Sequence, residues 1–166
     1  AEAQRLLKEA GVTNLKISFL NRNVAEPYTP AGIFVVDQWR RIGVQAEHKQ
    51  LETKLYFDAF KNGDFDVGIN FIADYIDDPS IHFLKVVPGT DVNYSGGTNP
   101  KLNELFNQQS QQVDPVERKK LTDEFQRISI TDAHSAMLYW WQRIIVYNKK
   151  IKGWELHASH FTGQGL

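Results

Sequence analysis

Apolar and polar residues alternate along three short stretches, and each stretch follows a segment with helical spacing. The alternation predicts strands at 15–20, 44–51 and 65–71. The helical spacing predicts helices at 1–10, 30–42 and 53–62, with glycines at 11, 43 and 63 placed to end them. A helix before every strand favours an α/β fold with a mostly parallel sheet, because parallel neighbours need crossover connections.

The sequence predicts both the start and the buried face of the helix at 30–42. Thr29 precedes Pro30, and a hydroxyl before a proline is typical of a helix N-cap followed by its first turn. The spacing of Ile33, Val36 and Trp39 predicts the stripe that faces the core, with Phe34 and Val35 as further candidates. Thr53 is placed in the same way to cap the helix that follows the second strand.

The second half of the chain predicts two further helices and two late strands. Asn99 and Asp114 each stand before a proline, and Glu117 completes a capping-box pattern after Asp114. The apolar runs from Met137 to Trp141 and from Ile144 to Tyr147 predict two buried strands. Because side chains alternate along a strand, one of the two adjacent tryptophans would face the core and the other a surface or cleft.

The stretch from Phe65 to Pro79, F-D-V-G-I-N-F-I-A-D-Y-I-D-D-P, predicts a strand that runs into carboxylates and a phenol. In open α/β sheets, ligands bind outside the carboxyl ends of the strands, so we expect a site here. Asp78 stands before Pro79 and is better placed to cap a short helix than to catalyse.

Composition excludes several classes of function. The 166 residues suffice for one domain with a core, and the formal net charge of -1 provides no field that attracts nucleic acid or an anionic membrane. The absence of cysteine excludes disulfides, thiolate catalysis and cysteine-ligated zinc. No apolar run is long enough to span a bilayer. Ala1 lies directly in an amphipathic helix, and we expect this start to be a cut inside a longer protein.

No catalytic motif is present. The chain has no nucleophile elbow, phosphate-binding loop, dinucleotide fingerprint or zinc-protease helix. The carboxylates from Asp74 to Asp78 leave a hydrolase open as the alternative function, although their spacing does not fit a calcium loop. His157 and His160 have metal-like spacing in a tail with no third ligand nearby, so we expect neither a metal nor another cofactor.

Motifs along nearly the whole chain resemble those of one family. They include A-x-x-L-L-K-E-A-G at the start, then W-R-R-I-G-V-Q-A, G-D-F-D-V, A-D-Y-x-x-D-P, N-Y-S-G-G-T-N-P-K-L-N-E-L, V-D-P-V-E-R-K-K-L-T-D-E-F-Q, L-Y-W-W and I-K-G-W. Each motif alone is weak, but their order and distances are specific. The chain resembles the C-terminal lobe of the extracellular solute-binding proteins of family 5, which are the oligopeptide-, dipeptide- and nickel-binding receptors of peptide-type ABC transporters.

The resemblance implies one lobe of a type II periplasmic-binding-protein-like fold, a mostly parallel sheet flanked by helices, spanning 1–166 without its N-terminal lobe. It also implies a receptor that is periplasmic, or a lipoprotein on the cell surface, and that binds a peptide or related solute between two lobes without catalysis. The implied partners are the ligand, the missing lobe and the permease subunits of the transporter, with no nucleic acid and no membrane span. A protein–protein interaction module remains a third possibility, because a sequence does not show exposed apolar patches.

The resemblance also implies roles for individual residues. Asp74 matches the position that pairs with the α-ammonium group of a peptide, and Phe71 matches a position that lines a side-chain pocket and is often tryptophan. Arg22 lies at or near the place of an arginine that holds the ligand's carboxylate in dipeptide binders. A turn carboxylate and a solvated loop arginine are the alternatives for Asp74 and Arg22. The full set of predicted ligand-binding residues is Asp74, Tyr75, Phe71, Arg22, Tyr94 and Trp140.

Overall fold

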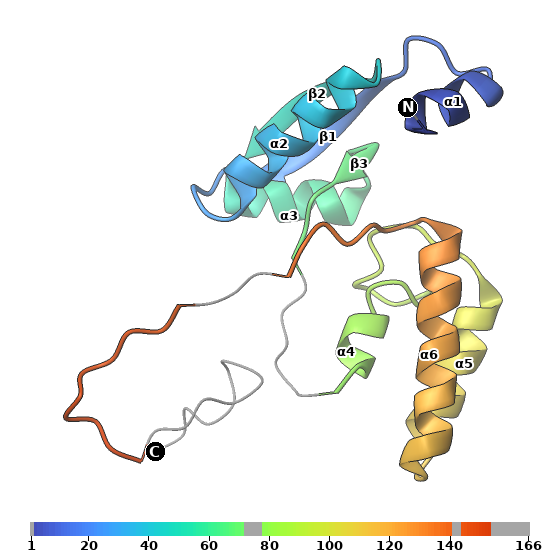
Figure 1. Ribbon diagram of the computed structural model, residues 1–166, viewed down its shortest axis with the longest axis vertical. Coiled ribbons are helices and arrows are strands. Elements are labelled where there is room, and N and C mark those ends of the chain that lie inside the picture. Colours follow the sequence, from blue (N-terminus) through green and yellow to red (C-terminus); the bar gives the residue numbers. More distant parts are fainter. Residues whose placement is uncertain (1, 72–77, 141–143, 154–166) are drawn as a thin grey trace. The chain divides into compact units, whose positions relative to one another are not determined.

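The computed structural model describes residues 2–71, 78–140 and 144–153 of the chain. It divides into two compact units, Ala1–Phe71 and Ile72–Leu166, and each is described here by itself (Figure 1).

The first unit is a three-stranded parallel sheet with helices between its strands. Its elements are α1 (Glu2–Glu9), β1 (Lys16–Arg22), α2 (Tyr28–Arg41), β2 (Gln45–Leu51), α3 (Thr53–Asn62) and β3 (Val67–Gly68). The strand order is β2-β1-β3. β1 pairs with β2 along its whole length, and with β3 only at Phe19 and Leu20. The α/β class with a parallel sheet flanked by helices is therefore confirmed.

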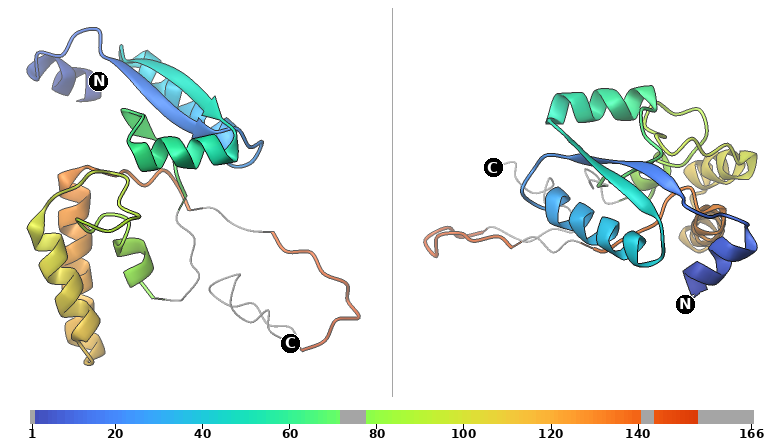
Figure 2. Two further views of the ribbon diagram at one scale, coloured as in Figure 1. Left: turned by 180° about the vertical axis from the view of Figure 1, so that it is seen from behind. Right: turned by 90° about the horizontal axis from the view of Figure 1, so that it is seen from above.

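The central strand β1 is buried on both faces. Phe19 is 2% exposed and packs on Val35 and Val36 of α2, whereas Leu20, which points to the opposite face, is 0% exposed. Seen from above, α2 and α3 lie on opposite sides of the strands (Figure 2). Parallel strands covered on both faces are typical of α/β folds.

The predicted inward face of α2 is confirmed in part. Val35 and Val36 are buried and Trp39 packs against them, whereas Ile33 and Phe34 are 57% and 64% exposed. Ala31 and Gly32, which were not predicted, are buried too. The helix begins at Tyr28, and the Thr29 hydroxyl donates to the Val24 carbonyl at 2.9 Å instead of capping. Four consecutive apolar residues at 33–36 leave the inward face undefined in the sequence, and packing against the sheet decides it.

The third strand is much shorter than the predicted 65–71. Only Val67 and Gly68 form strand β3. Just before it, the Asp66 carboxylate accepts a hydrogen bond from the Ser18 backbone at 2.7 Å. Just after it, the Ile69 carbonyl accepts one from the Tyr56 hydroxyl at 2.6 Å. The side chains of Asp66 and Tyr56 therefore bond to backbone groups that could otherwise pair in a longer strand.

Gly32 allows α2 to approach the sheet closely. A Cβ atom at this position would overlap the Asn21 amide nitrogen and would lie 2.6 Å from His48 Nε2. We expect Gly32→Ala to lower the free energy of unfolding by about 1–3 kcal/mol, the usual cost of overpacking a core. Gly97→Ala is the matched control, since its new methyl group would come no closer than 3.3 Å to the ring of exposed His134 and 3.7 Å to the Ser95 hydroxyl. Equal denaturant midpoints for the two variants would contradict the tight approach of α2.

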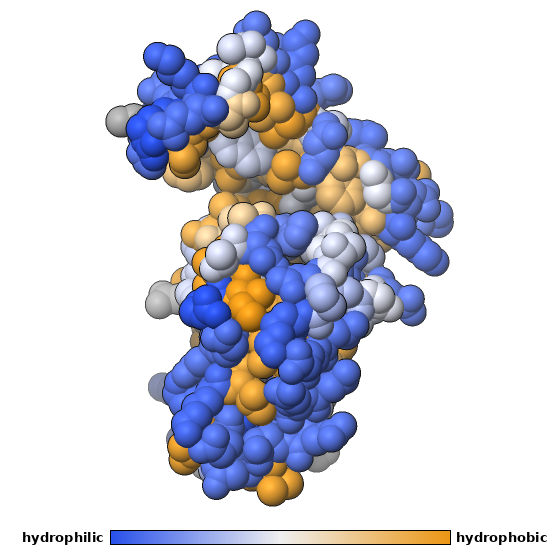
Figure 3. Space-filling view, turned by 90° about the vertical axis from the view of Figure 1, so that its right-hand side faces the viewer, coloured by the Kyte–Doolittle hydropathy of each residue, from blue (hydrophilic) through white to orange (hydrophobic). Residues whose placement is uncertain are grey.

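The second unit is helical in the part that the structure describes. Its helices are α4 (Ser80–Phe83), α5 (Pro100–Gln111) and α6 (Pro115–Asp132). Its core consists of Phe83, Val87, Leu102, Leu105 and Phe125. The outer face of these helices is mostly hydrophilic with a narrow apolar strip (Figure 3).

The predicted starts of α5 and α6 are confirmed. The Asn99 side chain accepts from the Lys101 backbone, and Asp114 Oδ1 accepts from the backbone of Val116 and Glu117. The second half of the capping box does not form, because the Asp114 N–H donates to the Gln112 side chain. A side-chain acceptor before a proline located these two helix starts, although the same signal at Thr29 and Pro30 did not locate the start of α2.

The two late strands predicted from Met137 to Tyr147 are not formed among the described residues of that segment, 137–140 and 144–147. Trp140 is 80% exposed, and Ile144 and Val146 are 88% and 90% exposed. A strand needs a neighbour to receive its backbone hydrogen bonds, and an apolar sequence does not supply one. The prediction of buried strands was wrong for these residues.

Candidate functional site

Arg22 lies at the carboxyl end of β1, where the parallel sheet ends. Its Nε donates to the Thr53 hydroxyl at 2.9 Å, so the first turn of α3 fixes the guanidinium. Its Cζ lies 5.5 Å from the ring centroid of Tyr28 and 5.7 Å from that of Phe57. A guanidinium between aromatic rings, held by one side-chain hydrogen bond, is oriented before any ligand arrives.

The positive charge of Arg22 has no carboxylate partner among the described residues. The ion pairs found there join other arginines and lysines to Asp or Glu. Arg22 is nevertheless half-buried. A partly buried, uncompensated guanidinium with free donors is suited to bind a carboxylate in bidentate geometry.

Tyr28 connects Arg22 with Phe71. The Tyr28 ring lies 6.0 Å from the ring of Phe71, edge to face, and 5.9 Å from that of Tyr56. Two of the predicted site residues, Arg22 and Phe71, therefore meet at one aromatic side chain. Phe71 is 42% exposed, so its ring also presents an apolar surface to solvent.

The Tyr28 hydroxyl is buried without a hydrogen-bond partner in the described part of the chain. Burial raises the pKa of this hydroxyl above its usual range, although Arg22 and Tyr56 act in the opposite direction. Arg22 and Tyr56 lie close enough to this hydroxyl to lower its pKa, so the hydroxyl adds a polar group beside the uncompensated cation.

The buried Asn21 side chain connects the residues of this site by hydrogen bonds. The side chain is fully buried, and its amide group contacts the Tyr28 carbonyl, the Arg22 backbone and the His48 ring. Neither Tyr28 nor Asn21 was predicted from the sequence. The sequence placed both residues in the loop that follows the first strand, because their roles depend on contacts made by the folded chain.

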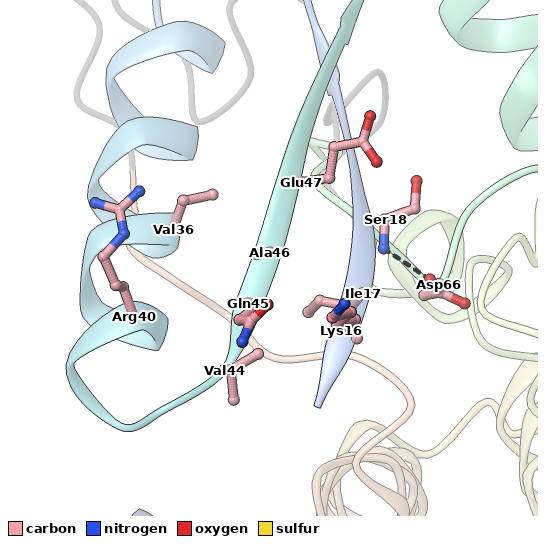
Figure 4. Close-up of a pocket in the computed structure, with 10 residues that line it drawn as sticks. All are labelled: Lys16, Ile17, Ser18, Val36, Arg40, Val44, Gln45, Ala46, Glu47 and Asp66. Atoms are coloured by element: carbon pink, nitrogen blue, oxygen red, sulfur yellow. Dashed lines mark hydrogen bonds between the residues drawn. The ribbon is translucent and has the colours of Figure 1, made fainter. Parts of the chain in front are cut away.

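A separate hollow of about 560 Å³ lies at the other end of the strands. Its lining includes Lys16, Gln45 and Glu47 from the amino ends of β1 and β2, Arg40 from α2, and Asp66 (Figure 4). The Asp66 carboxylate already accepts a hydrogen bond from the Ser18 backbone N–H. Ligands of open α/β sheets bind at the carboxyl ends of strands, so the edge with Arg22 is a better candidate than this hollow.

Asp78, the end of the carboxylate cluster, has a structural role. Its oxygens accept from Arg118 Nη2 at 2.9 and 2.8 Å and from the Ser80 backbone at 2.9 Å. Arg118 in turn donates to the buried Gln109 side chain at 3.1 and 2.9 Å. The network ties the start of α4 to α5 and α6, as the capping interpretation of Asp78 expected.

The pKa of Asp78 gives this network a pH dependence. Burial raises the pKa, but hydrogen bonds from Ser80 and Arg118 outweigh it, so the pKa lies below its usual value. A carboxyl whose pKa is depressed by folding stabilises the fold above its unfolded pKa, and loses that contribution as the pH falls through the folded pKa. The contribution of Asp78 to the stability of the fold is therefore present at pH 7, begins to fall below about pH 4, and is lost as the pH passes through the lower, folded pKa.

We expect Asp78→Asn to lower the free energy of unfolding by about 1 kcal/mol at pH 7, since the pair is partly exposed to solvent. The difference from the unmodified chain should be smaller at about pH 3, because the contribution is lost as the pH falls from the unfolded pKa through the lower, folded pKa of Asp78. Denaturant titrations at these two pH values measure this. Asp123→Asn, which removes an exposed pair with Lys119, is the matched control. A constant difference at both pH values would contradict the charge pairing.

The roles of the other four predicted site residues stay predictions. Asp74 and Tyr75 lie outside the described residues. Tyr94 and Trp140 belong to the second unit, where Lys85 Nζ lies 5.6 Å from the Tyr94 ring centroid and Trp140 is largely exposed. Their proposed contacts with a ligand stay predictions.

The described residues contain no group of three His, Cys, Asp or Glu side chains that would hold a metal ion. His157 and His160 lie outside them. None of the helices described is both long and apolar enough to cross a membrane.

Comparison with known proteins gives relatives of one kind. No family model matches the chain. The oligopeptide-binding protein OppA of Bacillus subtilis (strain 168) is 25% identical over 152 residues, which are 89% of this chain and 27% of that protein. The chain thus spans about a quarter of the length of its curated relative.

Solved structures show the same likeness. The unliganded open form of the periplasmic murein tripeptide binding protein MppA matches with a TM-score of 0.72 and 25% identity, over 80% of this chain and 26% of that one. The OppA protein of Burkholderia pseudomallei matches with a TM-score of 0.72 and 23% identity, over 80% and 27%. These matches confirm the predicted resemblance and the fold class.

Proposed function

We propose that this chain, a relative of the extracellular solute-binding proteins of family 5, is the C-terminal ligand-binding lobe of an ABC-transporter receptor. In this proposal it binds a peptide or a similar small solute in a cleft completed by an N-terminal lobe. The receptor is periplasmic or attached to the cell surface as a lipoprotein, and it delivers the solute to the permease subunits. The observation that carries the proposal is the uncompensated Arg22 guanidinium at the carboxyl end of the sheet.

Arg22 has the chemistry to hold one end of a peptide. A carboxylate placed on its free donors would form charge-assisted hydrogen bonds, and the nearby Tyr28 hydroxyl supplies a further polar group. The exposed ring of Phe71 adds an apolar contact for a side chain. A few convergent polar groups beside aromatic surface are typical of small-molecule sites.

Asp74 remains the proposed partner of the ligand's ammonium group. It follows β3 by six positions in the chain, and β3 is the neighbour of β1, which ends at Arg22. A cation and an anion at the two ends of a zwitterionic peptide would fix its register without reading its side chains.

Binding is favoured over hydrolysis by two observations. The relatives are named as binding proteins. Asp78, one of the carboxylates on which a hydrolase would depend, is engaged by Arg118 and by the start of α4. We therefore propose no catalytic step.

Calorimetric titration with a panel of di- to pentapeptides tests the proposal. A receptor that contains both lobes should bind members of the panel, whereas this chain alone should bind weakly. An exposed ion pair contributes only about 0–1 kcal/mol, but losing one partner of an enclosed pair costs about 2–5 kcal/mol. Mass spectrometry of the same samples should recover every peptide intact. Tight binding by the chain alone would contradict the two-lobe proposal, and cleaved peptides would favour the hydrolase.

A further inference from the structure

We propose that Asn21 and His48 are positioning residues for Arg22, and that protonation of His48 loosens their hold on the ligand site. The inference rests on the proposed function, in which Arg22 binds the ligand's carboxylate. It follows from the hydrogen bonds of one buried amide group.

The orientation of the Asn21 amide is fixed by two backbone groups. Asn21 Nδ2 donates to the Tyr28 carbonyl at 2.8 Å, and Asn21 Oδ1 accepts from the Arg22 N–H at 2.8 Å. A carbonyl can only accept and an N–H can only donate. Turning the amide over would place acceptor against acceptor and donor against donor, so only one orientation satisfies both contacts.

This orientation determines the state of His48. Asn21 Nδ2 lies 2.9 Å from His48 Nε2, and its second hydrogen is available for that contact. Nε2 must therefore accept, which requires a neutral imidazole with its proton on Nδ1. Burial independently lowers the pKa of His48 below its usual value.

Few groups compete with this contact. His48 packs beside Phe19 and Asn21 of β1 and Gly32 of α2, and Ala46 and Gln50 share its face of β2. None of these carries a charge. The charged neighbours Glu47 and Lys49 alternate to the opposite face of β2, and on α2 Asp37 pairs with Arg41. Among the titratable residues of α2, Tyr28 bonds directly to Asn21. The contact is made by the Tyr28 backbone carbonyl and not by its hydroxyl.

The amide also has no room to move away. A methyl group at position 32 would already overlap the Asn21 amide nitrogen, so α2 closes the space above it. Protonation of His48 would direct an N–H at the Asn21 NH₂ group across the present contact. Asn21 would then shift together with its other two partners, the Arg22 backbone and the Tyr28 carbonyl.

The direction of the pH effect follows from the depressed pKa. The folded chain binds fewer protons at His48 than the unfolded chain. The contribution of neutral His48 to the stability of the folded state is therefore complete above the unfolded pKa of about 6.5. It is lost as the pH falls through the lower, folded pKa of His48. The site should therefore be intact at neutral pH and should loosen in mild acid.

Nuclear magnetic resonance of this chain between pH 8 and pH 4.5 tests the inference without a ligand. We expect nitrogen spectra of the imidazole to show the Nδ1–H tautomer at neutral pH. The Arg22 backbone and Nε–H signals should then change with the same midpoint as the His48 ring. In His48→Gln, whose amide oxygen can accept from Asn21 near the position of Nε2, the Arg22 signals should lose that step. His134→Gln, which alters an exposed histidine, should keep it.

The outcomes separate this inference from the proposed function. An Nε2–H tautomer, or a His48 titration that leaves the Arg22 signals unchanged, would overturn the positioning role whether or not a peptide binds. Where the two-lobed receptor binds tri-alanine, its affinity should fall several-fold from pH 7.5 to pH 5 and stay constant in His48→Gln. An equal fall in both proteins would also overturn it. Failure of tri-alanine and of every other peptide to bind would refute the proposed function alone.

Discussion

Arg22→Ala in the two-lobed receptor should reduce peptide affinity by roughly 30- to 5,000-fold, which corresponds to about 2–5 kcal/mol. The physical reason is that an enclosed ligand carboxylate would be left without its cation, while Tyr28 and Phe57 would retain their positions around an empty space. Arg22→Lys should recover only part of the loss, because an ammonium group cannot reproduce the planar fork or its stacking on aromatic rings.

Arg40→Ala is the matched control for that measurement. Arg40 lines the hollow at the amino ends of the strands, so its removal should leave affinity unchanged if the ligand binds at the carboxyl ends. Thermal unfolding of each variant checks that the fold persists. Loss of affinity in Arg40→Ala with normal binding by Arg22→Ala would move the site to the hollow.

Phe125→Ala should lower the free energy of unfolding of the second unit by about 3–5 kcal/mol, because it leaves a large cavity in a core. Phe125 is 1% exposed and stacks on Phe83 with ring centroids 4.0 Å apart. Chemical denaturation followed by circular dichroism measures the change. The core of this unit is small, so we expect α4, α5 and α6 to lose structure together.

Val116→Ala on the same helix is the control, since Val116 is 63% exposed and should cost little. If Phe125→Ala were no more destabilising than Val116→Ala, the packing of α6 against α4 would be contradicted. Helix signals that melt in separate steps would contradict a shared core.

The elements that the sequence predicted well have local causes. The strands β1 and β2 follow from alternation, and α5 and α6 begin where Asn99 and Asp114 supply an acceptor before a proline. The buried side of α2 was predicted in part: Val35, Val36 and Trp39 pack on the core, whereas Ile33 does not, because it belongs to a run of apolar residues in which spacing alone does not identify one face. The late strands do not form at 137–140 and 144–147 for a related reason, since these segments are mostly apolar but a strand also requires a partner.

The candidate site was predicted in part. Arg22 and Phe71 were expected from motif positions at strand ends, and the structure brings both to the Tyr28 ring. Tyr28, Asn21 and Thr53 were missed as site residues because each acts through a contact with a distant part of the chain. Thr53 was expected to cap α3, but no side-chain cap forms there, and its hydroxyl instead accepts from Arg22.

A crystal structure of the two-lobed receptor with a bound peptide would test the central claim most directly. The proposal predicts a peptide carboxylate within hydrogen-bonding distance of the Arg22 guanidinium, beside Tyr28, at the carboxyl ends of β1 and β2. A peptide bound instead in the hollow lined by Lys16, Arg40 and Glu47, with Arg22 exposed to solvent, would contradict it.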